Sequence, residues 1–218
     1  DYWSQSVSNG GAIGIYLCGN GNTIVEQNEV FECDRGIGLC SESYKLQTKD
    51  CIVRDNFVYN NFRTGIYMGA YLGFDGLSTK NCYVVNNTLF NNNLKGGQLD
   101  GTNNYLKVND RDNSSEGEIR LSELCEENVI ANNIIYAVSD RDIFIRKYTT
   151  SGKNNYIGGN IYFSPTKKNH KWIWDGKEYT DFSAWQAVSG DKTSVFDVDP
   201  LLLSLIHISE PTRLDVIS

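Results

Sequence analysis

The chain has 218 residues, with 20 Lys and Arg against 27 Asp and Glu, which gives a formal net charge of −7. This acidic balance, without a block of basic residues, predicts neither a nucleic-acid partner nor an anionic-membrane surface. No apolar run approaches the ~18 residues that a membrane span needs, and a hydrophobic fraction of 40% excludes a disordered chain. The distinctive signal is an excess of turn-forming residues: 24 Asn and 20 Gly beside 3 Pro.

Five segments of the chain align without gaps on a single Asn. An aliphatic residue stands three positions before this Asn, and an apolar residue stands two positions after it. The segments are residues 23–31, 51–59, 82–90, 128–136 and 155–163, aligned on Asn28, Asn56, Asn87, Asn133 and Asn160. Repetition of this kind predicts short parallel strands stacked at about 4.8 Å per rung, so that each rung buries its neighbour's apolar face. The Asn is expected at the turn between strands, where Asn tolerates left-handed geometry and stacked amides can hydrogen-bond to one another.

A second short strand alternates with the first, at residues 14–17, 36–39, 65–68, 118–121 and 142–145. Ile is followed two positions later by Leu, Met or Ile, which indicates one buried face. The neighbouring positions are therefore expected to point outward in two columns. One column comprises Tyr16, Tyr67, Arg120 and Phe144; the other comprises Gly14, Gly36, Gly65, Glu118 and Asp142. Three inserts, residues 41–50, 70–80 and 94–116, are expected to wall this face.

Residues 10–163 resemble the right-handed parallel β-helix repeat family, the pectin-lyase-like superfold, on these repeated columns and the Asn position. The resemblance implies an all-β, right-handed, single-stranded parallel β-helix of about five coils. It also implies a polysaccharide or oligosaccharide partner, a bacterial source, and a secreted, cell-surface or periplasmic location. The known lyase motifs of the family do not appear residue by residue in this chain, so no catalytic residue of the family is assigned to it. Function in such folds resides in individual sites and does not follow from the fold.

The period ends after residue 163, and residues 164–202 are expected to cap the stack. Residues 172–179 predict a hairpin around Asp175-Gly176, and Asp181 can N-cap a short helix over residues 182–188 that stops before Gly190. The alternative for this region is a carbohydrate-stacking patch built on Trp172 and Trp174.

The C-terminal tail, residues 203–218, differs from the rest of the chain. Residues 203–213 resemble the conceptual translation of a sequencing adapter, so the tail is expected to be non-native. The three expected parts of the chain are then repeats over residues 1–163, truncated at the N-terminus, the cap over residues 164–202, and the tail.

Neither the spacing of the cysteines nor that of the acidic residues predicts a clear metal site. The six Cys lack zinc-ligand spacing; Cys51 and Cys82 fall in one inward column and are expected to be buried thiols. Cys18 and Cys40 share an outward column with poor disulfide geometry, although a disulfide framework is the alternative. Residues 110–116 faintly resemble a calcium loop but lack its central Gly and terminal Glu. No cofactor is therefore predicted, with calcium kept as the alternative.

The outward columns carry the candidate chemistry. Glu118 and Asp142 are predicted to lie on successive rungs, where two close carboxylates could serve a glycoside hydrolase. In a polysaccharide lyase, arginines such as Arg120 and Arg141 would supply the cationic and proton-abstracting groups. The predicted substrate-binding residues are Tyr16, Tyr67, Arg35, Phe144 and Arg146.

Two less specific interpretations stand beside these. Glu118 and Asp142 could simply pair with arginines on a solvated face. The chain could also be a non-catalytic glycan-binding or structural surface solenoid.

Overall fold

A computed structural model describes residues 12–71, 73–94, 116–138, 143–166 and 170–202. The described chain is built of strands, most of them in parallel sheets, with one short helix, α4 (Phe182–Ser189). This confirms the all-β parallel class. Within these residues, no helix has the length and apolarity to cross a membrane.

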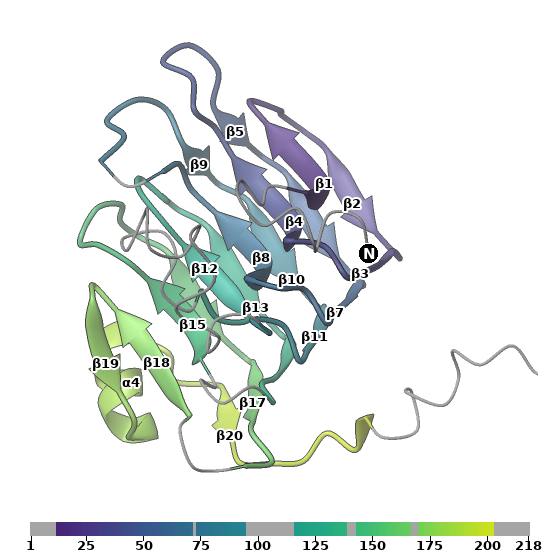
Figure 1. Cartoon of the computed structure of the whole chain (residues 1–218). Helices are drawn as coiled ribbons and strands as arrows, with labels where there is room; N and C mark the ends of the chain where they lie inside the picture. Colours follow the sequence, from purple (N-terminus) through teal and green to yellow (C-terminus); the bar gives the residue numbers. More distant parts are fainter. Residues whose placement is uncertain (1–11, 72, 95–115, 139–142, 167–169, 203–218) are drawn as a thin grey trace, which may run out of the picture.

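The strands enter three main sheets in turn (Figure 1). Each of the first five passes of the chain, here called rungs, adds one strand to each sheet. The seven-stranded sheet has the order β1 (Ile13–Cys18), β4 (Arg35–Cys40), β8 (Thr64–Met68), β12 (Ile119–Leu121), β15 (Ile143–Lys147), β18 (Lys171–Trp174) and β19 (Lys177–Tyr179). The five-stranded sheet has the order β16 (Tyr156–Gly158), β13 (Val129–Ala131), β10 (Tyr83–Val85), β6 (Ile52–Arg54) and β2 (Ile24–Glu26). The six-stranded sheet has the order β20 (Val195–Phe196), β17 (Ile161–Phe163), β14 (Ile134–Tyr136), β11 (Thr88–Phe90), β7 (Phe57–Tyr59) and β3 (Glu29–Phe31). A small parallel pair, β5 (Thr48–Lys49) and β9 (Thr79–Lys80), joins two of the connecting segments.

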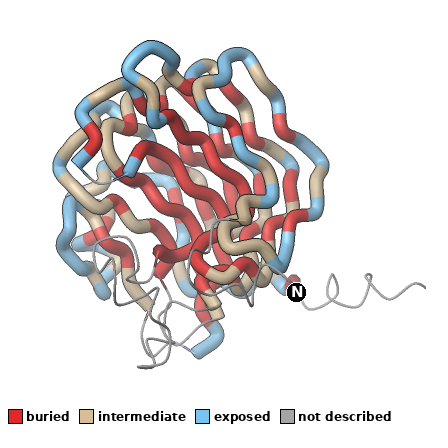
Figure 2. The backbone as a smooth tube through the Cα atoms, turned by 45° about the horizontal axis from the view of Figure 1, so that its top comes forward, coloured by how far each residue is buried: buried red, intermediate tan, exposed pale blue. Residues whose placement is uncertain are grey.

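The apolar columns predicted from the repeat form the core. In the five-stranded sheet, the residues three before the aligned Asn pair with one another in register and are buried; they are Val25, Val53, Val84, Ile130 and Ile157. In the six-stranded sheet, the residues two after the aligned Asn also pair in register and are buried; they are Val30, Val58, Leu89, Ile135 and Tyr162. Figure 2 shows the buried stretches of successive strands lying side by side. The identical register on each rung therefore gives one continuous core.

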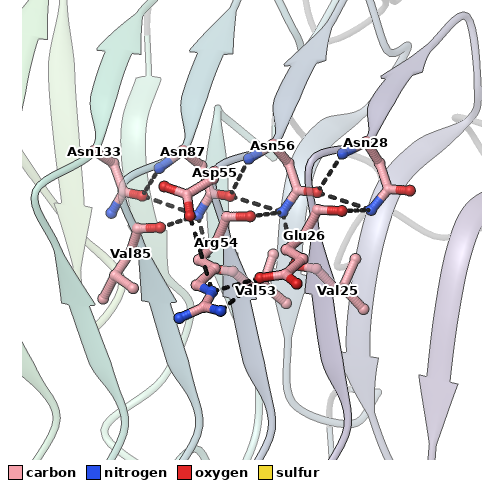
Figure 3. A network of polar contacts seen from close by, with 10 residues as sticks. All are labelled: Val25, Glu26, Asn28, Val53, Arg54, Asp55, Asn56, Val85, Asn87 and Asn133. Atoms are coloured by element: carbon pink, nitrogen blue, oxygen red, sulfur yellow. Dashed lines mark hydrogen bonds and ion pairs between the residues drawn. The ribbon is translucent and has the colours of Figure 1, made fainter.

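The aligned Asn residues form the predicted ladder between the five-stranded and six-stranded sheets (Figure 3). Asn87 Oδ1 accepts the backbone N–H and the Nδ2 of Asn56 at 3.1 and 2.9 Å, and Asn133 Oδ1 does the same for Asn87 at 2.9 and 3.1 Å. The left-handed residue, however, is the one before the ladder Asn, such as Asp55 at φ 55° and Asn86 at φ 57°. The expectation that the constant Asn itself is left-handed is therefore wrong. The role of this Asn is to supply the side-chain amide that hydrogen-bonds to the next rung.

A shorter ladder runs between the six-stranded and seven-stranded sheets and ends on Glu118. Asn61 Oδ1 accepts the Cys33 N–H at 3.0 Å, and Asn92 Oδ1 accepts the Asn61 N–H and Nδ2 at 3.1 and 2.8 Å. Glu118 continues this ladder: its Oε1 accepts the Asn92 N–H at 2.9 Å and its Oε2 accepts the Asn92 Nδ2 at 2.6 Å. Glu118 therefore acts as an acceptor at a buried corner of the stack.

The fifth rung of the seven-stranded sheet is displaced from the predicted alignment. Ile119 pairs with Ile145, and Arg120 pairs with Arg146, which is two positions further along β15 than the sequence alignment placed them. The Ile143-x-Ile145 pattern favours the predicted register, but in the structure Ile145 takes the place of the first Ile and Lys147 that of the second apolar residue, next to an irregularity in β15.

The hairpin and the short helix predicted after residue 163 are both present. β18 and β19 form an antiparallel hairpin around Asp175 and Gly176, both with positive φ. Asp181 caps α4 by accepting the Ala184 N–H at 2.8 Å, and Gly190 ends the helix in the left-handed conformation. Trp172 and Trp185 are fully buried and stack with ring centroids 5.8 Å apart, so Trp172 closes the core and cannot serve as an exposed sugar-stacking surface.

All six cysteines are free thiols in the structure. Cys51 and Cys82 are fully buried in the predicted inward column, and Cys18 pairs in register with Cys40 as expected. Desolvation raises the pKa of the Cys82 thiol to about 12.

Candidate functional site

The outer face of the seven-stranded sheet carries a row of aromatic and cationic side chains. The register aligns Tyr16, Gly38, Tyr67, Arg120 and Arg146 on successive rungs. Arg146 therefore occupies the position that the sequence had assigned to Phe144. The candidate site, here called the arginine cluster, comprises Tyr67, Arg120 and Arg146 of this row together with Asp34, Arg35, Arg63, Glu116 and Tyr148.

Tyr67 lies across the face toward the earlier rungs. Its ring covers Gly38, where a Cβ would come within 2.5 Å of the Tyr67 ring, and it stacks on Tyr16 with centroids 6.3 Å apart. The Arg35 guanidinium lies 5.3 Å from the centroid of the same ring. Gly38 is thus required for the space it leaves, because any side chain there would displace the tyrosine that supports Arg35.

Glu116 organises the centre of the cluster. It receives a bidentate contact from Arg35, with Nε–Oε2 at 3.1 Å and Nη2–Oε1 at 2.9 Å, and a contact from Arg120 Nη1 at 2.8 Å. The Arg63 guanidinium lies 3.7 Å from Glu116 Oε1, and its Nε also donates to both oxygens of Asp34 at 2.9 Å. Glu116 is 1% exposed, so these charge-assisted contacts are made with little competition from water.

The protonation states in the cluster follow from burial and from these partners. Burial alone would raise the pKa of the Glu116 carboxyl, but Arg120, Arg35 and Arg63 outweigh it and hold that pKa well below its usual range. Burial disfavours the charged Arg35 guanidinium, yet Glu116 and Asp34 outweigh that effect and raise the pKa of Arg35. Arg35 therefore stays protonated and can bind an anion, which makes it unsuited to abstracting a proton.

The far end of the row is built around Tyr148, which follows β15. The guanidinium carbons of Arg146 and Arg120 lie 4.0 and 4.8 Å from the Tyr148 ring centroid. Burial raises the pKa of the Tyr148 hydroxyl, so this group is neutral near pH 7. Within the described residues, the Tyr148 hydroxyl oxygen is buried and has no hydrogen-bond partner.

Some predicted site residues lie together in the structure, some lie outside the described residues, and two are placed differently from the prediction. Arg35, Tyr67, Arg120 and Arg146 lie together in the arginine cluster, and Tyr16 flanks it at 42% exposed. Asp142 and Arg141 lie outside the described residues, as does most of the calcium-like loop. Among the described residues, no group of three or more His, Cys, Asp or Glu is suited to hold a metal.

Two of the predicted positions were wrong. Phe144 is fully buried and packs against Trp172 with centroids 4.9 Å apart, so it cannot stack on a sugar. Glu118 is 1% exposed and is held by Asn92 at the end of the shorter ladder, which contradicts its prediction as an outward-facing acid. Ile119 pairs with Ile145 and not with Ile143 as predicted, and Asp142 lies outside the described residues.

The sequence prediction missed Asp34, Arg63, Glu116 and Tyr148. Arg35 pairs with Thr64, so Asp34 and Arg63 occupy equivalent positions immediately before β4 and β8. Extending the alignment of the second strand two residues toward the N-terminus would have placed these two opposite charges together. The same extension places Glu116 in this column, beside Arg63, but the bidentate contact that Glu116 receives from Arg35, 81 residues away, depends on side-chain directions that the repeat does not give.

Comparisons with known proteins give one relative and no function. No family model matches the chain, and no solved structure matches it. The chain is 30% identical over 191 residues to a protein of Bacillus subtilis (strain 168) described as "Uncharacterized protein YwoF"; the alignment covers 86% of this chain. The chain spans only 36% of the length of that relative, whose description states no activity.

Proposed function

We propose that this chain is a right-handed parallel β-helix whose arginine cluster binds an acidic polysaccharide. The fold proposal is supported by the three sheets, each of which receives one parallel strand from each of the first five rungs. Parallel crossover connections are right-handed in about 98% of cases, which gives the hand of the coil. A bacterial, secreted or cell-surface setting, as in the family that the repeat resembles, fits a polysaccharide ligand.

The observation that carries the binding proposal is the combination of guanidinium groups and aromatic rings on one outer face. Arg35 lies over Tyr67, and Arg120 and Arg146 lie over Tyr148. Guanidinium groups recognise carboxylates through paired N–H donors. Tyr67 is only 7% exposed, so the ring available to a sugar is that of the neighbouring Tyr16, which is 42% exposed and presents an apolar ring together with a polar hydroxyl. A uronic acid offers both matching features, a carboxylate and a sugar ring.

The buried anions of the cluster explain how the arginines are held ready for a ligand. Glu116 and Asp34 fix Arg35 and Arg63 through short contacts, so these side chains lose little rotamer freedom when a ligand binds. Arg146 is only half-buried, and it is the arginine best placed to contact a ligand from solvent. The cluster thus combines two arginines held in place, Arg35 and Arg63, with the more accessible Arg146.

Binding can be tested by affinity electrophoresis and calorimetry with polygalacturonate, alginate and hyaluronate, with dextran as the neutral comparison. Arg146→Gln should weaken binding to an acidic polymer about tenfold or more, because a hydrogen bond to a charged group contributes about 1.5–3 kcal/mol. Arg54→Gln is the matched control: Arg54 is 42% exposed and pairs with Glu26 on the five-stranded sheet, away from the cluster. Equal effects of the two substitutions, or equal affinity for dextran, would contradict the proposal.

Cleavage of the bound polymer by β-elimination is the second candidate, favoured by Tyr148, whose ring contacts two arginines and whose hydroxyl is buried. In this reaction a base removes the proton beside the carboxylate, the C–O bond to the leaving sugar breaks, and the leaving oxygen takes up a proton. A neutral Tyr148 hydroxyl could donate that proton, while the arginines neutralise the carboxylate. Absorbance at 235 nm would report the unsaturated product. New reducing ends without that absorbance would indicate hydrolysis, and silence in both assays with retained binding would leave a glycan-binding protein.

A further inference from the structure

A second aromatic surface lies beyond the other ends of β4 and β8, in the inserts that follow these strands. Tyr44 is 68% exposed and Tyr71 is 47% exposed, and both contact the buried Phe74. The Tyr44 and Phe74 ring centroids are 5.0 Å apart, and those of Tyr71 and Phe74 are 5.1 Å apart. We call Tyr44, Tyr71 and Phe74, together with the adjacent Asp75, the tyrosine platform.

The two inserts that carry this platform are fastened to each other. Ser43 and Leu77 form an antiparallel bridge, in which the Leu77 N–H donates to the Ser43 carbonyl at 3.2 Å. The Tyr44 hydroxyl donates to Asp75 Oδ1 at 2.8 Å. β5 and β9 extend the same association further along the inserts. The exposed rings therefore belong to a braced structure and are not independent loop tips.

Two further contacts fix the position of the platform. A Cβ at Gly76 would lie 2.5 Å from the Phe74 ring and 2.8 Å from the Tyr44 ring, so the backbone at Gly76 packs directly against both rings. The Gly73 N–H donates to Glu123 Oε1 at 3.1 Å, and Ala70 bridges to Glu123, which ties the insert to the following rung. These contacts keep the rings of Tyr44 and Tyr71 exposed to solvent, although their apolar surface would otherwise favour burial.

We propose that the tyrosine platform is a second carbohydrate subsite, which stacks an uncharged part of a sugar ring on Tyr44 and Tyr71 and presents the Asp75 carboxylate to sugar hydroxyls. Tyr side chains supply a rigid apolar surface with a polar tip, which matches the mixed apolar and hydroxyl character of a pyranose. The platform carries no guanidinium group, so it favours a ring face over a carboxylate.

The position of the platform indicates that one polymer could reach both sites; this part of the inference rests on the proposed function. Arg35 begins β4 and Cys40 ends it, so Arg35 lies one strand length, roughly 16 Å, from the end of β4 after which the insert with Tyr44 begins. A polymer lying across the seven-stranded sheet would place an acidic sugar on the cluster and another sugar on the platform. Because the two contacts are linked by one chain, long oligosaccharides should bind more tightly than disaccharides.

The test uses the full chain and uronate oligosaccharides of graded length, with binding followed by calorimetry. Tyr44→Ala and Tyr71→Ala should each weaken binding of long oligosaccharides about tenfold, while Tyr44→Phe, which keeps the ring, should retain most of the affinity. Tyr156→Ala is the matched control, because Tyr156 is 51% exposed on the five-stranded sheet. Circular dichroism would verify that each variant is folded.

The outcomes separate the two proposals. Weakening by both platform substitutions but not by Tyr156→Ala supports the platform. If Arg146→Gln weakens binding and the platform variants do not, the platform is refuted while the arginine cluster stands. If the platform variants weaken binding and Arg146→Gln does not, the cluster is refuted and the platform stands. No binding of any oligosaccharide, charged or neutral, by the folded wild-type chain refutes both.

Discussion

Replacement of one ladder Asn by Ala should show how strongly the amide column holds the rungs together. Asn87 lies in the middle of the ladder and is 1% exposed. Its Oδ1 accepts two hydrogen bonds from Asn56, and its Nδ2 donates to Val53 O at 2.9 Å, to Val85 O at 3.1 Å and to Asn133 Oδ1 at 3.1 Å. Asn87→Ala removes all five contacts and adds no group that could replace them.

The magnitude follows from the groups that the substitution leaves behind. The Asn56 N–H, the Val53 carbonyl and Asn133 Oδ1 each lose a partner in a buried setting. Leaving a buried polar group unsatisfied costs about 1–3 kcal/mol, so two to three such groups give a loss of roughly 3–6 kcal/mol. Asn28→Ala is the matched control at the end of the same ladder. There the amide donates to the Glu26 carbonyl and to Asn56 Oδ1 at a partly exposed position where water can substitute, and the expected loss is about 1 kcal/mol.

Urea unfolding monitored by far-ultraviolet circular dichroism would measure both losses from the shift of the midpoint at constant slope. Tryptophan fluorescence provides a second probe, because Trp172 and Trp185 are buried in the C-terminal cap. Coincident transitions would show that the rungs unfold together. Equal losses at positions 87 and 28, or a loss below about 1 kcal/mol at position 87, would refute the view that buried amide bonds stabilise the stack.

Three further predictions concern the arginine cluster and the thiols. Glu116→Gln should lower the free energy of unfolding by about 3–5 kcal/mol, because it leaves Arg35 and its neighbours without their shared carboxylate. The pKa of Glu116 is lowered on folding, so the wild type should lose this stability as the pH falls below the unfolded pKa of about 4.3. In acid denaturation the stability of the variant should change less over that range. Gly38→Ala should destabilise by about 1–3 kcal/mol through a clash with Tyr67, and combining it with Tyr67→Ala should recover most of that loss in a double-mutant cycle; additive losses would show that the clash is absent. In native protein a thiol reagent should modify the exposed Cys18 quickly and the buried Cys82 only after unfolding, with mass spectrometry locating the label; rapid labelling of Cys82 would contradict its burial.

The sequence by itself determined the apolar columns, the main Asn ladder and the cap. Val53 and Val58 recur at fixed distances around Asn56 because each rung must present the same apolar residues to the rungs on either side. Repetition of this kind is visible in one dimension, since stacking in register converts equal sequence positions into spatial neighbours. Local rules likewise determined α4, whose N-cap and left-handed C-cap depend only on nearby residues.

Only the tertiary structure decided the shifted pairing of β15 and the composition of the arginine cluster. The pairing of β15 with β18 is irregular between Ile143 and Arg146; Phe144 lies in the core beside Trp172, while Arg146 aligns with Arg120 on the outer face. Glu116 shares the repeat position of Asp34 and Arg63, but its bidentate contact with Arg35 joins side chains 81 residues apart, and the direction of those side chains is not visible in the repeat. A repeated column fixes which residues stack, because every rung obeys the same geometry. Long-range ion pairs depend on side-chain directions at individual positions, and these are determined only when the rungs are packed.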